Sequence, residues 1–302
     1  MNIKQALIFG TKELKNSKIN SASLDAEILL SWILKKPKEF IYAHPEKIIN
    51  SQQLTKFRKL INQCAKGMPI AYLTGHKEFY GLDFIVNKNV LIPRPETELL
   101  VEEALHYIKI NLPSKINNLQ LIDIGTGSGC IPIAIAKNLY NVKCIKYYGI
   151  DNSPKTLTVA RGNAKMHGLT NKIKFFTSDL LKNIPHNTLY FIHNTHLILT
   201  TNLPYLPQKL YLKNYHNLKY EPKNSLVAGH DGLKYYRQLL KQLQSLATND
   251  LRLISLFLEI NPSQTTAIKK FIIKLFPQAK ILIKKDIGGQ NRLLIVKLSQ
   301  KR

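Results

Sequence analysis

Apolar residues recur at helical spacing in the first part of the chain. Residues 3–16 and 24–34 carry them three and four positions apart, which predicts two amphipathic helices. Acidic residues begin the second of these segments and two lysines end it, as the helix dipole favours. A third helix is expected from Ser51, as its N-cap, to Gly67, which ends it. Together these helices predict a small bundle over residues 1 to about 70.

The pattern changes to short strand-like runs between about residues 77 and 92. Strands are expected at 78–80, 82–86 and 90–92, arranged as a hairpin connector. The segment Pro93-Arg94-Pro95-Glu96-Thr97-Glu98 follows, and its two prolines exclude a regular helix before Thr97. By composition alone this segment is typical of a rigid linker.

From about residue 119 onward, strand and helix patterns alternate. The expected strands are 119–124, 145–150, 173–177, 197–201, 251–259 and two more near 280 and 294; the expected helices are 130–139, one opened by Ser153-Pro154, 233–246 and one ending at Phe276. Such alternation predicts a mostly parallel sheet with helices on both faces. Ligands of such sheets bind at the carboxyl ends of the strands.

Composition narrows the class of protein. The 302 residues suffice for a large α/β domain and a smaller companion domain. Three separated cysteines indicate neither a disulfide framework nor a zinc cluster, and His193 and His196 lack metal-binding partners, so both are expected in a loop and no metal site is predicted. No apolar run reaches membrane-spanning length, so we expect a soluble cytoplasmic protein and no membrane contact.

The net charge leaves two interpretations open. With 44 basic and 19 acidic residues, the formal charge is +25. Such a field favours an acidic partner such as RNA, a ribosome or an acidic protein. The lysines are nevertheless spread along the chain without a sustained basic block, which equally fits a compositional habit of the whole genome.

A glycine loop follows the first strand of the alternating region. In Asp123-Ile124-Gly125-Thr126-Gly127-Ser128-Gly129 the glycines allow a cofactor to approach the backbone, and the next helix points its N-terminus at it. Cys130 stands where a dinucleotide fingerprint needs glycine, whereas the observed spacing is common in S-adenosylmethionine-dependent methyltransferases. Asp151, at the end of the second strand, is placed to accept both ribose hydroxyls. Ser178-Asp179-Leu180, after the third strand, either borders the adenine or is a plain turn.

The fourth strand leads into Asn202-Leu203-Pro204-Tyr205. An amide nitrogen is a poor nucleophile, and a site helps by accepting both of its N–H bonds. The Asn202 side-chain oxygen and the Leu203 backbone carbonyl are the expected acceptors, and Tyr205 is expected to cover the flat face of the group. Alone, this tetrapeptide would equally fit a simple proline turn; after the glycine loop and Asp151 it indicates methylation of an amide or amine.

These motifs resemble the HemK/PrmC family, the glutamine-N5 methyltransferases of peptide chain release factors. The resemblance covers nearly the whole chain and rests on four segments beyond the catalytic loop: Ile92 to Glu98, Asp123 to Gly129, Glu221-Pro222 with Ala228 to Leu233, and Asp286 to Arg292. It implies a Rossmann-like S-adenosylmethionine-dependent methyltransferase domain (96–302), a small N-terminal helical bundle that docks the release factor (1–75) and a β-hairpin linker (76–95).

The resemblance also implies the activity. A methyl group would pass from S-adenosylmethionine to the side-chain amide of the glutamine in the Gly-Gly-Gln motif of class 1 release factors, supporting translation termination. Residues Gly125 to Gly129, Asp151, Leu180 and Asn202 would contact the cofactor, and Asn202 to Tyr205 would hold the glutamine amide. We expect a monomer that requires no nucleic acid.

Two departures from the family pattern and three alternatives accompany this expectation. Leu203 replaces the usual proline, which removes a rigid φ but keeps the carbonyl, and Glu259-Ile260-Asn261-Pro262 replaces a common Glu-Ile-Gly, which leaves the next turn open. A ribosomal-protein glutamine methyltransferase, a nucleic-acid adenine or amine methyltransferase and a non-catalytic binding protein remain alternatives. The chain's own Gly288-Gly289-Gln290 is interpreted as a glycine-rich hairpin turn.

Overall fold

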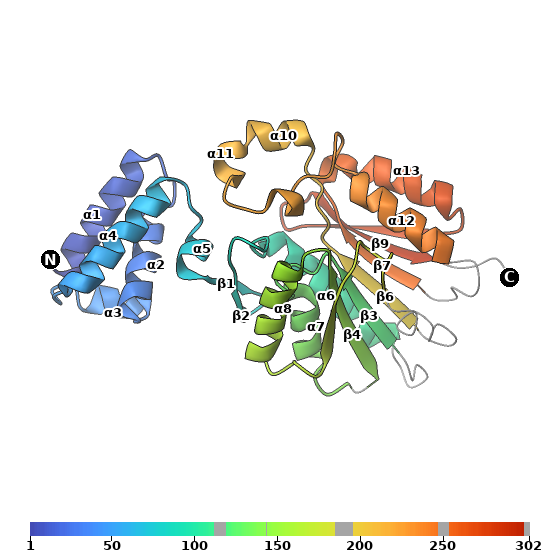
Figure 1. The fold of residues 1–302 in the computed structure, drawn as a ribbon, viewed down its shortest axis with the longest axis horizontal. Helices are drawn as coiled ribbons and strands as arrows, with labels where there is room; N and C mark the ends of the chain where they lie inside the picture. Colours follow the sequence, from blue (N-terminus) through green and yellow to red (C-terminus); the bar gives the residue numbers. More distant parts are fainter. Residues whose placement is uncertain (112–118, 143, 185–195, 247–253, 299–302) are drawn as a thin grey trace. The chain divides into compact units, whose positions relative to one another are not determined.

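A computed structural model describes residues 1–111, 119–142, 144–184, 196–246 and 254–298. The chain divides into two compact units, Met1–His76 and Lys77–Arg302 (Figure 1). His193 and the first three residues of the expected strand 251–259 lie outside the described residues. Each unit has its own apolar core, so each is considered by itself.

The smaller unit is a helical bundle. Its helices are α1 Ile3–Asn16, α2 Ala22–Leu34, α3 Lys38–Ala43, α4 Ser51–Ala65 and α5 Ile70–Thr74. The short α3 and α5 were not predicted, because helices of five or six residues show too little periodicity. Gly10 lets α1 pack closely, since a Cβ there would lie 2.8 Å from the Phe57 ring and 3.2 Å from Ala26 Cβ.

The start of α4 corrects one prediction. The N-cap is Asn50, and Ser51 is the first helical residue. The Asn50 side chain accepts a hydrogen bond from the Gln53 backbone N–H at 2.8 Å, and the Gln53 side chain accepts one from the Asn50 N–H. This reciprocal capping box satisfies two donors, one more than a serine cap at position 51 could satisfy.

The larger unit is built on a seven-stranded sheet in the order β5-β4-β3-β6-β7-β9-β8. The strands are β3 Leu119–Ile124, β4 Ile145–Asp151, β5 Ile173–Thr177, β6 His196–Thr201, β7 Ile254–Glu259, β8 Lys280–Lys285 and β9 Asn291–Leu298. All pairs are parallel except β7 with β9 and β8 with β9. His196 therefore begins a strand and is no loop residue, because its backbone continues the β6 ladder beside Leu119.

Helices cover both faces of this sheet (Figure 1). One core joins the sheet to α6 Glu98–Asn111, α7 Cys130–Asn138 and α8 Pro154–Met166, and the other joins it to α12 Lys234–Leu246 and α13 Thr265–Leu275. The alternating strands and helices of the sequence thus form a Rossmann-like α/β domain. Three short helices, α10 Gln208–Lys213, α11 Tyr215–Leu218 and η3 Lys223–Ser225, lie between β6 and α12 and were not predicted.

The hairpin consists of β1 His76–Phe79 and β2 Leu82–Ile85. Phe79 and Phe84 are buried in the core that contains α6 and α7. The predicted strand at 90–92 is wrong. The Ile92 N–H hydrogen-bonds to the Glu221 carboxylate instead of to a strand, and Pro93 has no N–H to extend a ladder.

A 3-10 turn, η1 Pro95–Thr97, leads directly into α6. The turn after β7, which the sequence left open, is a second 3-10 helix, η5 Pro262–Gln264. Asn261 caps it, because its side-chain oxygen accepts the Ser263 N–H at 3.0 Å. Asparagine and proline thereby terminate the strand without the glycine common in the family.

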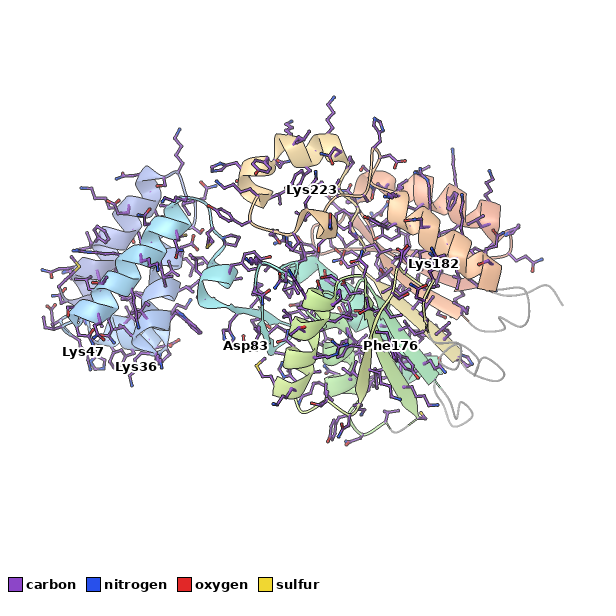
Figure 2. All side chains as sticks on the ribbon, viewed as in Figure 1. Lys36, Lys47, Asp83, Phe176, Lys182 and Lys223 are labelled. Atoms are coloured by element: carbon purple, nitrogen blue, oxygen red, sulfur yellow. The ribbon has the colours of Figure 1, made fainter. Side chains whose placement is uncertain are left out.

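Charged side chains are distributed over both units. Lys36 and Lys47 lie on the smaller unit and Lys182 and Lys223 on the larger one, all exposed (Figure 2). Across the described ranges, none of the helices is both long and apolar enough to cross a membrane. No group of three or more metal-binding side chains gathers in that part of the chain either.

Candidate active site

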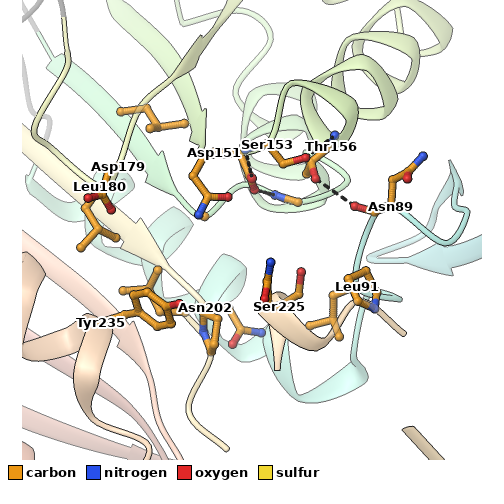
Figure 3. Close-up of a pocket in the computed structure, with 18 of the residues that line it drawn as sticks. Asn89, Leu91, Asp151, Ser153, Thr156, Asp179, Leu180, Asn202, Ser225 and Tyr235 are labelled. Atoms are coloured by element: carbon orange, nitrogen blue, oxygen red, sulfur yellow. Dashed lines mark hydrogen bonds between the residues drawn. The ribbon is translucent and has the colours of Figure 1, made fainter. Parts of the chain in front are cut away.

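A pocket lies at the carboxyl ends of β3, β4 and β6 in the larger unit (Figure 3). Seven of the predicted site residues line it: Gly125, Gly127, Asp151, Leu180, Asn202, Leu203 and Pro204. Thr126, Ser128, Gly129 and Tyr205 do not. The parallel strands bring these segments together because consecutive loops emerge at the same edge of the sheet.

The glycine loop is tied down at its base. The backbone N–H groups of Gly125 and Thr126 both donate to the Ile150 carbonyl, each at 2.8 Å. Gly127 has a φ of 56°, in the region that favours glycine, and a Cβ there would approach nothing closer than the Gly125 carbonyl at 3.9 Å. Position 127 therefore presents open backbone to the pocket.

The other residues of the glycine loop, Thr126, Ser128 and Gly129, do not line the pocket and instead hold the loop in place. Thr126 and Ser128 are buried, and the Ser128 carbonyl accepts a hydrogen bond from Asn163 at 2.8 Å. Gly129 is the N-cap of α7 with a φ of 80°. Beneath the loop, burial raises the pKa of Asp123 to about 7, although the hydrogen bond from the Thr200 hydroxyl opposes the shift.

Asp151 lies at the end of β4 and serves the loop as well as the pocket. Its Oδ2 accepts the Gly127 N–H at 3.2 Å, and its Oδ1 accepts the Ser153 N–H at 3.0 Å. Burial raises the pKa of this carboxyl, and backbone N–H groups, among them these two, oppose the rise. Because a carboxylate offers about four acceptor sites, Asp151 retains capacity to accept a hydroxyl group in the pocket.

Leu180 enters the pocket from the segment after β5. Its φ of 55° is in the left-handed region, which is unusual for a leucine. The next residue is fixed, because the Leu181 N–H donates to the Gln242 side chain on α12 at 2.8 Å. Ser178 and Asp179 also line the pocket, and Asp179 and Leu180 lie on the side opposite Asn89 and Leu91 (Figure 3).

Asn202 is oriented by a residue far away in the sequence. Its side-chain Nδ2 donates to the Thr97 hydroxyl at 3.0 Å, which turns Oδ1 away from Thr97. Leu203 is buried, and its side chain packs against Gly125, where a Cβ would lie 3.1 Å from Leu203 Cδ2. The amide loop and the glycine loop are therefore in direct contact.

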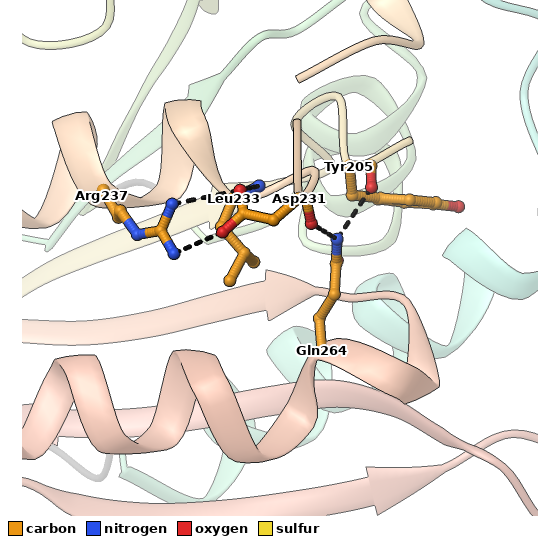
Figure 4. A network of polar contacts seen from close by, with 5 residues as sticks. All are labelled: Tyr205, Asp231, Leu233, Arg237 and Gln264. Atoms are coloured by element: carbon orange, nitrogen blue, oxygen red, sulfur yellow. Dashed lines mark hydrogen bonds and ion pairs between the residues drawn. The ribbon is translucent and has the colours of Figure 1, made fainter. Parts of the chain in front are cut away.

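Tyr205 is partly buried and stands outside the pocket lining. Burial raises the pKa of its phenol to about 12. Its backbone carbonyl accepts a hydrogen bond from Gln264 at 2.9 Å, and the same amide group donates to the Asp231 carbonyl (Figure 4). A Cβ on Gly232 would lie 2.1 Å from the Tyr205 carbonyl oxygen, so only glycine permits this approach.

A further segment closes the pocket. Pro222, Asn224 and Ser225 line it, and the preceding Glu221, 4% exposed, forms an ion pair with Arg94 at 2.5 Å. Arg94 belongs to the linker segment before α6, and Glu221 belongs to the segment after α11. Charge pairing thus joins two motifs that are 127 positions apart.

Comparisons with known proteins agree with this geometry. The family model described as "PrmC N-terminal domain" matches residues 5–75, and the model described as "Methyltransferase domain" matches residues 115–245. The release factor glutamine methyltransferase of Dictyoglomus turgidum is 32% identical, and the alignment covers 97% of this chain and 98% of that protein. The enzyme of the same name from Clostridium botulinum is 34% identical with the same coverage. The chain belongs to the family of release factor glutamine methyltransferases.

Among solved structures, the N-terminal domain of human METTL16 in complex with SAH has a TM-score of 0.50 at 13% identity, covering 90% of this chain and 94% of that one. This likeness shows the fold alone.

The pocket of this release factor glutamine methyltransferase family member fits S-adenosylmethionine. The open backbone at Gly127 admits a ligand, the Asp151 carboxylate retains acceptor capacity, and Leu91, Leu180 and Tyr235 supply apolar walls. A nucleoside with a hydroxylated sugar and a flat base matches these features.

Several pocket residues escaped sequence reasoning. They come from four segments and were not expected at the site: Lys88, Asn89 and Leu91 after the hairpin; Asn152, Ser153 and Thr156 after β4; Asn224 and Ser225 on η3; and Tyr235 on α12. The Thr156 hydroxyl donates to the Asn89 carbonyl at 2.9 Å and so joins the first segment to α8 (Figure 3). Only the proximity of Ser153 and Thr156 to Asp151 in the sequence could have indicated them.

Proposed function

We propose that this protein transfers a methyl group from S-adenosylmethionine to the side-chain amide nitrogen, N5, of the glutamine in the Gly-Gly-Gln motif of class 1 peptide chain release factors. The observation that carries the proposal is the orientation of Asn202. Its amide donates to Thr97, so its carbonyl oxygen is available to accept an N–H from a substrate amide. Family membership supplies the class of substrate.

The residues of the pocket have separate proposed roles in binding the cofactor and the substrate. Gly125, Gly127, Asp151 and Leu180 hold the cofactor, while Thr126, Ser128 and Gly129 support the loop from the positions described above. S-adenosylmethionine held there would supply an electrophilic methyl group, its sulfur keeping the electron pair of the broken S–C bond as the amide nitrogen forms the new C–N bond, and the proton displaced from that nitrogen would pass to solvent. Asn202 Oδ1 and the Leu203 carbonyl accept the two N–H bonds and orient the nitrogen, with Pro204 and Tyr205 shaping the loop.

The smaller unit is proposed to dock the release factor, with domain limits at 1–75, 76–95 for the linker and 96–302 for catalysis. A groove on this unit exposes Ile8 and Tyr42, which are 60% and 61% exposed. Ile8→Asp should raise the KM for release factor and leave cofactor affinity unchanged. The matched control is Ile110→Asp on the larger unit, where the exposure is 58%.

We also propose that the enzyme acts as a cytoplasmic monomer without nucleic acid.

Methyl transfer to purified substrates tests the proposed function. Tritiated S-adenosylmethionine is incubated with a class 1 release factor, with the same factor carrying Gln→Ala in its Gly-Gly-Gln motif, with a ribosomal protein fraction and with RNA. We expect label only on the unaltered release factor, and mass spectrometry should place it on the glutamine. Labelling of RNA or ribosomal protein in place of the release factor would overturn the assignment.

A further inference from the structure

The orientation of Asn202 is a polarity choice. A side-chain amide has two N–H donors at one end and an acceptor oxygen at the other, so a flip would reverse what the pocket presents to a substrate. Thr97 makes the choice in this structure, because its hydroxyl accepts from Asn202 Nδ2 at 3.0 Å. Thr97 is 2% exposed and lies on η1, outside the pocket lining.

The Glu259 carboxylate determines whether the Thr97 hydroxyl donates or accepts toward Asn202. Glu259 ends β7, is 1% exposed, and receives hydrogen bonds from the side chains of Thr97 and Tyr205. A hydroxyl has only one proton to donate. Once Thr97 gives that proton to the carboxylate, it can act toward Asn202 only as an acceptor. Glu259 is held in turn at its backbone, where its carbonyl accepts from the Tyr236 hydroxyl.

We propose that Thr97 and Glu259 are positioning residues that fix the polarity of the Asn202 amide, so that its oxygen and not its nitrogen faces the substrate. The inference rests on the proposed function and deepens it. Neither residue touches the reacting atoms. Glu259 also bonds to Tyr205, so one buried carboxylate organises both ends of the Asn202–Tyr205 loop.

The charge state of Glu259 makes this device sensitive to pH. Burial raises its pKa to about 7, opposed by the bonds from Thr97 and Tyr205 and by the charge of Arg292, and supported by the charge of Glu96. The titratable and charged groups facing it are Glu96 on η1, Cys130 on α7, Tyr205 after β6, Tyr236 on α12 and Arg292 on β9.

Protonation of Glu259 would weaken the fixed direction of the hydrogen bonds that run from Asn202 through Thr97 to Glu259. A neutral carboxyl can donate to Thr97, which then frees the Thr97 proton for Asn202 Oδ1 and favours the reversed amide. The reversed amide points N–H groups at a substrate that also offers N–H groups. The rate of methyl transfer should therefore rise with pH through about 7.

Four variants test the proposal in the full-length protein. Thr97→Val removes the hydroxyl at nearly constant volume and should lower kcat about tenfold or more, with KM for release factor and cofactor affinity nearly unchanged. Thr97→Ser keeps the hydroxyl and should retain kcat within about threefold. Thr158→Val, at an exposed threonine of α8, is the matched control. Glu259→Gln should lower kcat and abolish the rise in rate near pH 7.

A second measurement needs no methyl transfer. The Asn202 side-chain amide, identified in a nitrogen-15 NMR spectrum by its loss in Asn202→Asp, should titrate with a midpoint near pH 7 and should not titrate in Glu259→Gln. Wild-type kcat and an unaltered pH profile in a folded Thr97→Val, or an Asn202 signal insensitive to pH, would overturn the positioning role. Failure of the wild type to label release factor would instead overturn the proposed function, and the Asn202 titration would still decide the positioning role.

Discussion

The pocket has two walls: a cofactor wall, formed by the glycine loop, Asp151 and Leu180, and an amide wall, formed by the loop from Asn202 to Pro204 and held in place at Tyr205. The contacts that hold these two walls differ greatly in sequence separation. On the cofactor wall, the Gly127 N–H bonds to Asp151 only 24 positions later, and the loop base bonds to the neighbouring Ile150. On the amide wall, Asn202 bonds to Thr97 across 105 positions and Tyr205 bonds to Gln264 across 59. The cofactor wall is thus a local structure, and the amide wall exists only in the assembled domain.

This difference has a functional consequence. The glycine loop and Asp151 tolerate change elsewhere in the sheet, since the bonds between them form within one β3-α7-β4 unit, whereas the Leu180 segment also depends on Gln242 of α12. The amide wall depends on η1, η5 and the segment around Gly232 at the same time. Substitutions far from the pocket should therefore damage methyl transfer more readily than they damage cofactor binding.

The largest expected effect comes from Gly232→Ala, which would introduce a steric clash behind the amide wall. The new Cβ would lie 2.1 Å from the Tyr205 carbonyl oxygen and 2.4 Å from Gln264 Nε2, and φ at this position is +75°. We expect a loss of unfolding free energy of about 3 kcal/mol or more, measured by denaturant titration.

The control for this substitution is Gly162→Ala. Gly162 lies within α8, and a Cβ there meets nothing within 4 Å. Alanine should be neutral or stabilise by up to about 1 kcal/mol, because it favours the helix more than glycine does. Equal stability of the two variants would show that the approach of Gly232 to Tyr205 is unimportant.

The contrast between the walls also explains what the sequence could predict. The parallel sheet, the glycine loop and the place of Asp151 follow from contiguous motifs, and Asn202 to Pro204 follow from their position after a strand. The roles of Thr97 and Glu259 could not be derived, because they depend on side chains that meet only through tertiary packing. The expected strand at 90–92 failed for the same reason, since Glu221 supplies the partner of Ile92 from 129 positions away.

Asn202→Ala removes the acceptor that defines the amide wall. Single-turnover transfer to release factor at saturating cofactor should slow by about a hundredfold, the usual loss for one preorganised contact to a reacting group. Cofactor affinity, measured by calorimetry, should change little, since the glycine loop and Asp151 remain. An unchanged rate in the folded variant would exclude Asn202 from the mechanism.

Asp151→Ala tests the cofactor wall in the same way. We expect cofactor affinity to fall by about tenfold to a hundredfold, the equivalent of about 1.5–3 kcal/mol for a charge-assisted hydrogen bond. Asp151→Asn is the matched variant, because its side-chain oxygen can still accept the Gly127 N–H. It should fall between the wild type and the alanine variant, and identical affinities in all three proteins would contradict a role for this carboxylate.

The smallest expected effect joins the two walls at Leu203, which stands where the HemK/PrmC pattern that the sequence resembles has proline. Burial raises the pKa of the Tyr236 phenol, and a backbone hydrogen bond from Leu203 opposes that rise, so the Leu203 N–H is the donor. Leu203→Pro deletes that donor while keeping the carbonyl proposed to orient the substrate, so stability should fall by about 1 kcal/mol and the transfer rate should change only a few-fold. Tyr236→Phe removes the same bond from its other end. In a double-mutant cycle, Leu203→Pro should then cost less in the Tyr236→Phe background than in the wild type. Strictly additive effects on unfolding free energy would mean that the proline acts through φ or through the lost packing of Leu203 on Gly125, and not through this bond.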